Sequence, residues 1–510
     1  MVTFTSADAA AEDVGTTLAG AGFDVGPVRP LRRTVLDTFD GRVAAAGWQL
    51  ELREHPHRQL VLTAPGSAPA ALPVETTPRF ATDLPSGPFR ARLAPVLEVR
   101  ALSPVLTLEG RHAQAVRRNR DGKVLVQLDL HLQVRVEGHD GVAPLWGIDV
   151  SELAGYAKEG ARARALLAGL GLGAAADIVT AAAAAAGIDL SGAHSSPTVP
   201  LTAAGPALAA YRRVLANLAG TVEANHQGTV EDVDPEFLHD LRVAVRRTRS
   251  VLAQSKGVLP AAVRDQYRQS FRWLGEITGP ARDLDVYVIE WDGYVAPLGP
   301  VGAADLAPVL AHVGRRRQAA HTALAKGLRS TRYRALMAAW TAWVRGDEPE
   351  GGGDDAVRPI GQVAAARTAR AHKRLLRRGR SITPDSPAED LHELRKDAKR
   401  LRYLLECFGS LYDGGARKAF VQRLKALQDN LGTHQDAEVH VSQLRAFSDE
   451  LHGKRGLAAA TLIAMGQLAE HLDRRRRAAR EEFAGRFAAY DTKQTARTFN
   501  ALLRSAGGGG

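Results

Sequence analysis

Over about the first 170 residues, hydrophobic and polar positions alternate in short runs separated by glycine, proline and aspartate. A period of two is typical of β-strands, because successive side chains point to opposite faces. The segment 120–123, Arg-Asp-Gly-Lys, predicts a hairpin turn. The pattern predicts strands at 59–63, 96–99, 105–108, 124–130 and 132–136, and helices at 8–21 and 158–170.

After residue 201 the pattern changes, and apolar residues recur at spacings of three and four, which predicts helices. The polar segment 191–204, which contains two prolines, predicts a linker between a domain at 1–190 and a helical domain at 205–500. A Gly/Asp-rich insert at 346–359 divides the helical part into halves at about 205–345 and 360–500. The tail 501–510 is expected to be disordered.

The two halves of the helical part repeat each other. His239-Asp240-Leu241-Arg242 returns as His392-Glu393-Leu394-Arg395, and 392 − 239 gives an offset of 153. The same offset joins further pairs: Arg246/Lys399, Arg247/Arg400, Arg249/Arg402, Arg272/Lys425, Gly279/Gly432, Asp283/Asp436 and Asp285/Glu438. Because one offset serves two blocks without a gap, the sequence indicates an internal duplication.

The repeated motifs place basic side chains on one face of a helix in each half. In the first half they stand at i, i+3, i+7 and i+10, beside a neighbouring apolar stripe. The predicted faces are His239, Arg242, Arg246 and Arg249, and His392, Arg395, Lys399 and Arg402. Asp234-Pro235 and Ser386-Pro387 predict the N-caps of these helices.

No acidic residue is expected on these basic faces, and like charges three or four positions apart destabilise an isolated helix by about 0.2–0.5 kcal/mol per pair. A polyanionic partner would remove this cost, since guanidinium groups bind phosphate oxygens in pairs. The alternative is a solvated basic surface. The carboxylates Asp283, Asp285 and Asp436 are expected to cap helices or to orient the basic side chains, and a metal site made of them is the less favoured alternative.

The distribution of charge along the chain supports a polyanionic partner for the helical part. Residues 1–204 carry 19 Lys+Arg and 21 Asp+Glu, a net charge of −2, whereas residues 205–510 carry 48 and 35, a net charge of +13. Cys407 is the only cysteine and the first residues lack a basic and apolar leader, so a cytoplasmic protein is expected.

Four stretches together resemble the CHAD domain over about residues 205–500: HDLRVAVRRTR (239–249), LGEITGPARDLDV (274–286), HELRKDAKRLRYLLE (392–406) and LQDNLGTHQD (427–436). The resemblance implies two pseudo-symmetric helical bundles around a basic cavity that binds inorganic polyphosphate, and association with polyphosphate granules and their proteins. It adds Arg272 and Lys425 to the eight residues of the two basic faces as phosphate contacts. Tyr403 is the main aromatic residue among them.

The first ~190 residues resemble a CYTH domain, through 37–40 (DTFD), 44–48 (AAAGW), 50–53 (LELR), Arg111 and the predicted strand that ends near Asp129. That family implies an antiparallel β tunnel that holds a triphosphate with basic side chains and Mg²⁺ or Mn²⁺ with glutamates. The expected fold class is therefore multidomain α+β, with a barrel-like first domain and an all-α duplicated bundle.

The first domain departs from the CYTH pattern. The opening Glu-x-Glu-x-Lys is absent, Glu51 stands where an arginine is expected, and the late acidic strand is reduced to Asp149. Arg53, Arg111 and Asp129 remain as a residual tunnel set. Because metal-assisted hydrolysis needs carboxylates around the ion, we expect a tunnel without catalysis or cofactor, or a sequence that begins downstream of the motif.

Three functions stay open from the sequence. The favoured one is polyphosphate binding without catalysis, in the cytoplasm or at polyphosphate granules. A metal-dependent triphosphatase or polyphosphatase is the second. Nucleic-acid binding is the third, and it is disfavoured because the basic faces lack interleaved aromatic residues for base stacking.

Overall fold

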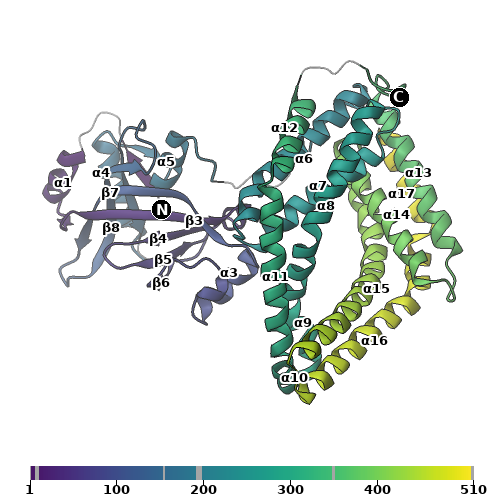
Figure 1. Ribbon diagram of the computed structural model, residues 1–510. Helices are drawn as coiled ribbons and strands as arrows, with labels where there is room; N and C mark the ends of the chain where they lie inside the picture. Colours follow the sequence, from purple (N-terminus) through teal and green to yellow (C-terminus); the bar gives the residue numbers. More distant parts are fainter. Residues whose placement is uncertain are drawn as a thin grey trace. The chain divides into compact units, whose positions relative to one another are not determined.

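The structure is a computed structural model that describes residues 2–5, 11–152, 155–190, 198–346, 351–455 and 457–506. The chain divides into two compact units, Met1–Ser195 and Ser196–Gly510 (Figure 1). The first unit is built on an antiparallel β-sheet, and the second is helical, as the expected α+β class requires. Of the predicted linker, residues 191–197 lie outside the described residues.

The sheet of the first unit has ten strands in the order β10-β1-β9-β8-β7-β3-β4-β5-β6, and β2 pairs with β7. The long strands β3, β7 and β8 form its centre (Figure 1). The strands are β1 Val2–Thr5, β2 Asp24–Val25, β3 Arg29–Thr38, β4 Gln49–Arg53, β5 Gln59–Thr63, β6 Ala70–Pro73, β7 Leu102–Arg118, β8 Val124–Val136, β9 Leu145–Glu152 and β10 Gly173–Ala175.

The two faces of this sheet differ in polarity because side chains alternate along each strand. On β8 and β9, Leu128 and Ile148 belong to an apolar core, whereas Asp129 and Asp149 point to the opposite face. Helices accompany the apolar cores: α1 Ala11–Gly20, α2 Arg42–Ala45, η1 Ala81–Asp83, α3 Pro88–Leu97, α4 Ala157–Gly169 and α5 Ile178–Ala186. The other face carries the polar residues described below.

The predicted strand at 96–99 is wrong, because residues up to 97 belong to α3. Pro88 stands in the first turn of that helix, and Leu93 and Leu97, four residues apart, are both buried. The predicted strands 124–130 and 132–136 are one continuous strand, β8, with an irregular register near residues 131–134. The predicted hairpin joins β7 to β8, and Gly122 adopts the expected positive φ of 77°.

The helices of the second unit reproduce the sequence repeat. Three successive helices begin at residues 207, 235 and 261, and three more begin at 360, 388 and 414, so each pair differs by 153. The helices are α6 Ala207–Val230, α7 Pro235–Ala253, α8 Ala261–Ile289, α9 Trp291–Val295, η2 Ala296–Leu298, α10 Gly299–Asp305, α11 Ala307–Leu328, α12 Thr331–Arg345, α13 Ile360–Ser381, α14 Ala388–Cys407, η3 Gly409–Leu411, α15 Gly414–Arg455, α16 Ala459–Tyr490 and α17 Lys493–Ala506.

Two apolar cores hold the halves of the helical unit together. The larger core joins helices of both repeats, and α7 packs against α14 within it. The smaller core joins the end of α8 and helices α9–α11 to α15 and α16. Between these two contacts the ribbons of α8 and α15 run apart (Figure 1).

The ends of the helices in this unit correct two expectations and confirm a third. Residues 501–506 are not a disordered tail but the end of α17, where Leu502 and Ala506 are fully buried; residues 507–510 lie outside the described part. Asp234 caps α7 as predicted, by accepting from the N–H groups of residues 236 and 237. Ser386 does not cap α14; it accepts instead from the N–H of Thr383.

In the described ranges no single helix is long and apolar enough to cross a membrane. One bent pair, Trp291–Asp305 with Ala307–Leu328, meets that test only when its two members are taken together.

Substitution by alanine is expected to change stability in opposite directions at two helical glycines. A Cβ on Gly228 of α6 would lie 2.3 Å from Cδ1 of the buried Phe237, whereas a Cβ on Gly314 of α11 would meet nothing within 4 Å. We expect Gly228→Ala to destabilise the helical unit by about 1–3 kcal/mol through overpacking, and Gly314→Ala to stabilise it by about 0.5–1 kcal/mol. Urea unfolding of the full chain followed by far-UV circular dichroism measures both; a shift of the same sign in both variants would contradict the packing.

Candidate functional site

The basic faces of the two repeats meet where α7 packs against α14. The guanidinium of Arg246 on α7 lies over the ring of Tyr403 on α14, 5.3 Å from its centroid. One residue further along α7, Arg247 forms a 2.8 Å ion pair with Glu406 of α14. These two contacts fix the register of the helices. We call the six cations on the two facing surfaces the basic cluster: Arg242, Arg246, Arg249, Arg395, Lys399 and Arg402.

Lys399 shows how close the cations of the two repeats are. Burial, together with the positive charges of Arg395 and Arg246, lowers the pKa of Lys399 to about 8, against an opposing effect of Asp436. Arg395 belongs to the same helix, but Arg246 belongs to the other repeat. The sequence could not show that these two faces point toward a common region, and the structure brings them together.

Glycines let two arginines lie flat across neighbouring helices in the same way in both repeats. A Cβ on Gly279 of α8 would lie 3.4 Å from Nη1 of Arg242, and a Cβ on Gly432 of α15 would lie 2.7 Å from Nη1 of Arg395. Both pairs are related by the offset of 153. Nη1 of Arg395 is buried and lacks a hydrogen-bond partner among the described atoms. The close approach therefore leaves a buried donor without an acceptor.

The basic neighbours of Arg242 also affect its pKa. Burial lowers its pKa below the ordinary arginine value; Asp283 opposes this effect, and Arg246, Arg282 and Arg249 add to it. Nη1 of Arg242 donates to the carbonyl of residue 275 at 3.2 Å and to Oγ1 of Thr278 at 3.1 Å. These acceptors are neutral, so they orient the guanidinium without cancelling its charge.

The expectation of basic faces without acidic neighbours is only partly correct. Glu406 follows Arg402 by one helical turn and accepts from its Nε at 2.6 Å. Asp436 of α15 accepts from Nη2 of Arg395 at 3.1 Å. The contact of Asp436 agrees with the expectation that this carboxylate orients a basic side chain. The pairing of Glu406 with Arg402, both on α14, was not expected.

The remaining predicted contacts lie on the same four helices. His239 and His392 are half-buried, and Nδ1 of His392 donates to Oε1 of Gln435 at 2.5 Å. Arg272 and Lys425 are exposed on α8 and α15, and Lys425 pairs with Asp429 at 2.7 Å. These positions agree with a continuing basic surface along α8 and α15.

The carboxylates of the helical unit divide into two kinds. Asp285 is buried and accepts from Nε of Arg317 at 2.6 Å, and the same guanidinium binds Asp232, so Asp285 fixes α8 against α11. Asp283 is exposed to solvent, yet the surrounding protein raises its pKa and Arg242 opposes the rise. Asp285 is therefore part of the framework, whereas Asp283 and Asp436 border the basic cluster.

The lowered pKa of Lys399 predicts a cost to the unliganded fold. Between pH 8 and the ordinary value of 10.5 the folded chain binds fewer protons than the unfolded chain, so stability rises with pH in that window. We expect Lys399→Met to stabilise the free chain below about pH 8 and to lose this advantage as the pH approaches 10.5. Thermal unfolding at pH 7 and pH 10 measures the change.

Lys396→Met is the matched control for this prediction. Lys396 is exposed on the same helix and pairs with Glu393 at 2.6 Å, so its removal relieves no buried charge. A gain of stability in the control equal to that of Lys399→Met would show that the substitution acts through helix propensity and not through charge.

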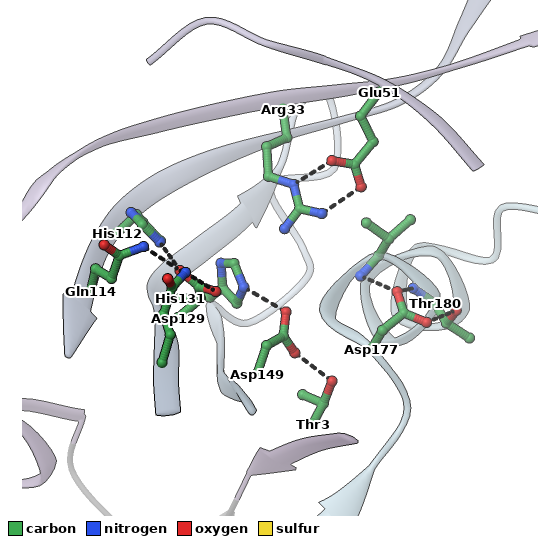
Figure 2. A network of polar contacts seen from close by, with 12 residues as sticks. Thr3, Arg33, Glu51, His112, Gln114, Asp129, His131, Asp149, Asp177 and Thr180 are labelled. Carbon is green, nitrogen blue, oxygen red and sulfur yellow. Dashed lines mark hydrogen bonds and ion pairs between the residues drawn. The ribbon is translucent and has the colours of Figure 1, made fainter. Parts of the chain in front are cut away.

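In the first unit, the polar face of the sheet carries its own counter-ions. Glu51 of β4 is buried at 2% exposure and accepts from Arg33 of β3, with Nε of Arg33 at 3.1 Å (Figure 2). It also accepts from Nε of Arg53 at 2.8 Å. These two guanidiniums outweigh the effect of burial and lower the pKa of Glu51 to about 2. Glu51 therefore occupies the anion position between the two arginines.

A second chain of contacts lies near the first (Figure 2). Asp149 of β9 accepts from Oγ1 of Thr3 at 2.5 Å and from Nε2 of His131 at 2.9 Å. Burial lowers the pKa of His131, and Arg33 acts in the same direction. Three strand pairings separate β9 from β3, which corresponds to about 14 Å in a flat sheet. Arg33 of β3 nevertheless lowers the pKa of both His131 on β8 and Asp149 on β9. This effect across the sheet indicates that the sheet curls around its polar face.

The residual tunnel residues do not form a metal site. Asp129 interacts with Nε2 of His112 at 3.4 Å and accepts from the side-chain amides of Gln114 and Gln127. Arg111 is exposed on β7. Within the described ranges no group of three or more His, Cys, Asp or Glu residues is arranged to hold a metal ion. The carboxylates of this face do not fit a divalent cation, because guanidinium, amide, imidazole and hydroxyl groups already bind them.

Arg33 and His131, which were not predicted as site residues, explain why the charges on this face of the sheet compensate one another. Arg33 lies in a basic run, Arg32-Arg33, and alternation along β3 was the signal that one of the two faces inward. His131 ends a run of alternating residues in β8 that includes Gln127 and Asp129. The pairing of β3 with β4 that brings Arg33 near Glu51 could not be read from one sequence.

Removal of the internal carboxylate predicts a large loss of stability. Glu51→Gln leaves Arg33, at 6% exposure, as an uncompensated buried charge, which costs about 3–5 kcal/mol. We expect the first unit to unfold at lower denaturant, as measured by near-UV absorption or proteolysis of the full chain. In the double variant Arg33→Met/Glu51→Leu most of the stability should return; a double variant as unstable as Glu51→Gln would mean that charge is not the cause.

Comparison with known proteins identifies the family that the helical unit resembles. A family model described as the CHAD domain matches residues 213–445. Two curated proteins from strains of Mycobacterium tuberculosis, both described as uncharacterized, are 30% identical over 212 residues, which is 40% of this chain and 39% of each relative. The match thus spans about two fifths of the length of those relatives.

Two solved structures are also similar to this chain. The CHAD domain from the plant Ricinus communis is 30% identical, covers 60% of this chain and 96% of its own, and has a TM-score of 0.45. PptA from Streptomyces chartreusis is 18% identical, with 56% and 99% coverage and a TM-score of 0.43. The antiparallel sheet of the first unit is consistent with a tunnel-like CYTH fold.

Proposed function

Because residues 213–445 form a CHAD domain, we propose that the helical unit binds inorganic polyphosphate through the basic cluster. The observation that carries the proposal is the convergence of Arg246 from one repeat with Arg395 and Lys399 from the other. Like charges held together at a half-buried position raise the free energy of the empty site. A polyanion that enters this position relieves the repulsion and raises the pKa of Lys399 again.

A chain of phosphates suits this surface better than a single small anion. The cations are distributed over α7 and α14 and continue to Arg272 on α8 and Lys425 on α15. Guanidinium groups bind two phosphate oxygens at once, whereas the lysine ammonium acts as a point charge. A ligand with one charge at every phosphate can contact these separated groups simultaneously.

Two features favour polyphosphate over the alternatives. Tyr403, the main aromatic residue among the predicted contacts, is buried at 7% exposure beneath Arg246, so it offers no ring for base stacking. In the first unit, the carboxylates that would hold Mg²⁺ or Mn²⁺ for a triphosphatase are bound by other side chains. The proposal therefore assigns binding and no catalysis, and places the protein at polyphosphate granules with their proteins as partners.

The proposal predicts that a double variant with one cation removed from each repeat loses affinity for polyphosphate. Arg246→Gln/Lys399→Gln removes one cation from each repeat; at about 1.5 kcal/mol per charge-assisted contact, the Kd for long-chain polyphosphate should rise roughly 100-fold. Isothermal titration of the full chain at several salt concentrations measures the Kd. The affinity of the wild-type chain should fall with salt, and the slope should be smaller in the double variant.

A double variant with the same loss of charge elsewhere is the control. Lys326 on α11 and Lys493 on α17 are exposed and lie outside the basic cluster. Lys326→Gln/Lys493→Gln should bind polyphosphate nearly as the wild type does. Equal weakening in both double variants would indicate attraction by net charge alone, and displacement of polyphosphate by single-stranded RNA at equal phosphate concentration would favour nucleic-acid binding.

A further inference from the structure

A small pocket lies where α7 and α14 meet α6 and α15, and its wall includes Arg247, the neighbour of Arg246 in the basic cluster. Its volume is about 230 Å³. The lining residues come from α6, α7, α14, α15 and the segment before α6: Thr198, Val199, Val214, Asn217, Leu218, Arg247, Glu406, Cys407 and Arg417.

Two guanidinium groups of this pocket hold buried donors without acceptors. Nε of Arg247 and Nε of Arg417 are both buried and have no hydrogen-bond partner among the described atoms. The position of Arg417 is fixed by close packing, since a Cβ on Gly409 would lie 3.1 Å from its Nη1. Buried donors on a charged group are costly to leave unpaired, so two of them in one pocket indicate a missing acceptor.

The only carboxylate that lines the pocket does not supply this acceptor. Oε2 of Glu406 accepts from Nη2 of Arg247 at 2.8 Å, and Oε1 accepts from Nε of Arg402 at 2.6 Å. Both oxygens are therefore in use, and the described residues give Arg417 no salt bridge. With Arg247 and Arg417 positive and Glu406 negative, the lining keeps one uncompensated positive charge.

We propose that this pocket is a second anion site, which takes one small tetrahedral oxyanion of the inorganic phosphate class between Arg417 and Nε of Arg247. A phosphate oxygen can accept from each guanidinium while others face Asn217 and Thr198, and this geometry needs several acceptors on one compact centre. A pocket of this volume admits a single phosphate group, so its proposed ligand differs from the long chain that we assign to the basic cluster.

Cys407 supplies a local readout, because it lines the pocket and is the only cysteine in the chain. Burial raises the pKa of the Cys407 thiol to about 12, so its alkylation is slow and is followed over hours. The experiment measures the rate of Cys407 alkylation by iodoacetamide in the full chain at pH 9 by mass spectrometry, relative to the same chain without phosphate. Inorganic phosphate is varied at constant ionic strength set with chloride. Bound phosphate blocks the pocket, so we expect the alkylation rate to fall several-fold and to saturate with phosphate.

Arg417→Gln should raise the phosphate concentration needed for protection at least about ten-fold, the loss expected for one charge-assisted contact. Lys418→Gln removes the same charge from the next, exposed position and should leave protection unchanged. Both variants should still bind long-chain polyphosphate, which separates this site from the basic cluster. Failure of polyphosphate binding in the wild type would refute the proposed function and leave the phosphate result standing.

Two outcomes would overturn the second site. The first is the absence of phosphate protection in the wild-type chain, and the second is equal protection in Arg417→Gln and the wild type. If Arg417→Gln does not fold, the wild-type chain still decides: sulfate should protect Cys407 as phosphate does, whereas equal protection by chloride or nitrate would show a general salt effect and no tetrahedral site.

Discussion

The helical unit depends on the packing of α7 against α14, where an apolar layer holds two sets of cations near each other. Leu241 and Val245 on one helix and Leu394 and Leu401 on the other are buried in the same core. Each such side chain contributes about 1.5–3 kcal/mol, which offsets the repulsion among the cations above them. The favourable apolar contact thus maintains an electrostatically unfavourable arrangement of cations.

In the first unit, by contrast, a buried carboxylate neutralises the arginines on the polar face of the sheet. Arg33 and Arg53 share one internal carboxylate, Glu51. Imidazole, amide and hydroxyl groups bind the other two carboxylates of this face, Asp129 and Asp149. An incoming oligophosphate would have to displace a carboxylate that is already buried and bound by two cations. In the first unit one buried carboxylate thus bridges both arginines. In the helical unit Asp436 and Glu406 pair with Arg395 and Arg402, whereas Arg246 and Lys399 have no ion pair among the described residues.

The sequence predicted features that depend on local periodicity and on repetition. Helix starts, the offset of 153 and the basic faces were accessible because each is written in spacings of three, four or 153 residues. It failed where distant contacts decide the structure. The neutralisation of Arg33 depended on Glu51, which comes from the neighbouring strand. The end of α17 was missed because its burial depends on packing against α13.

The length of α15 has a mechanical consequence. This helix runs without a break over 42 residues, about 63 Å at 1.5 Å per residue. Near its start Phe420 and Leu424 belong to the larger core, and near its end Leu444 and Phe447 belong to the smaller one. A stiff rod anchored in both cores acts as a lever. A rotation of a few degrees at the crossing of α7 and α14 would displace its far end by several ångströms, so strain from a bound chain would be transmitted to the smaller core.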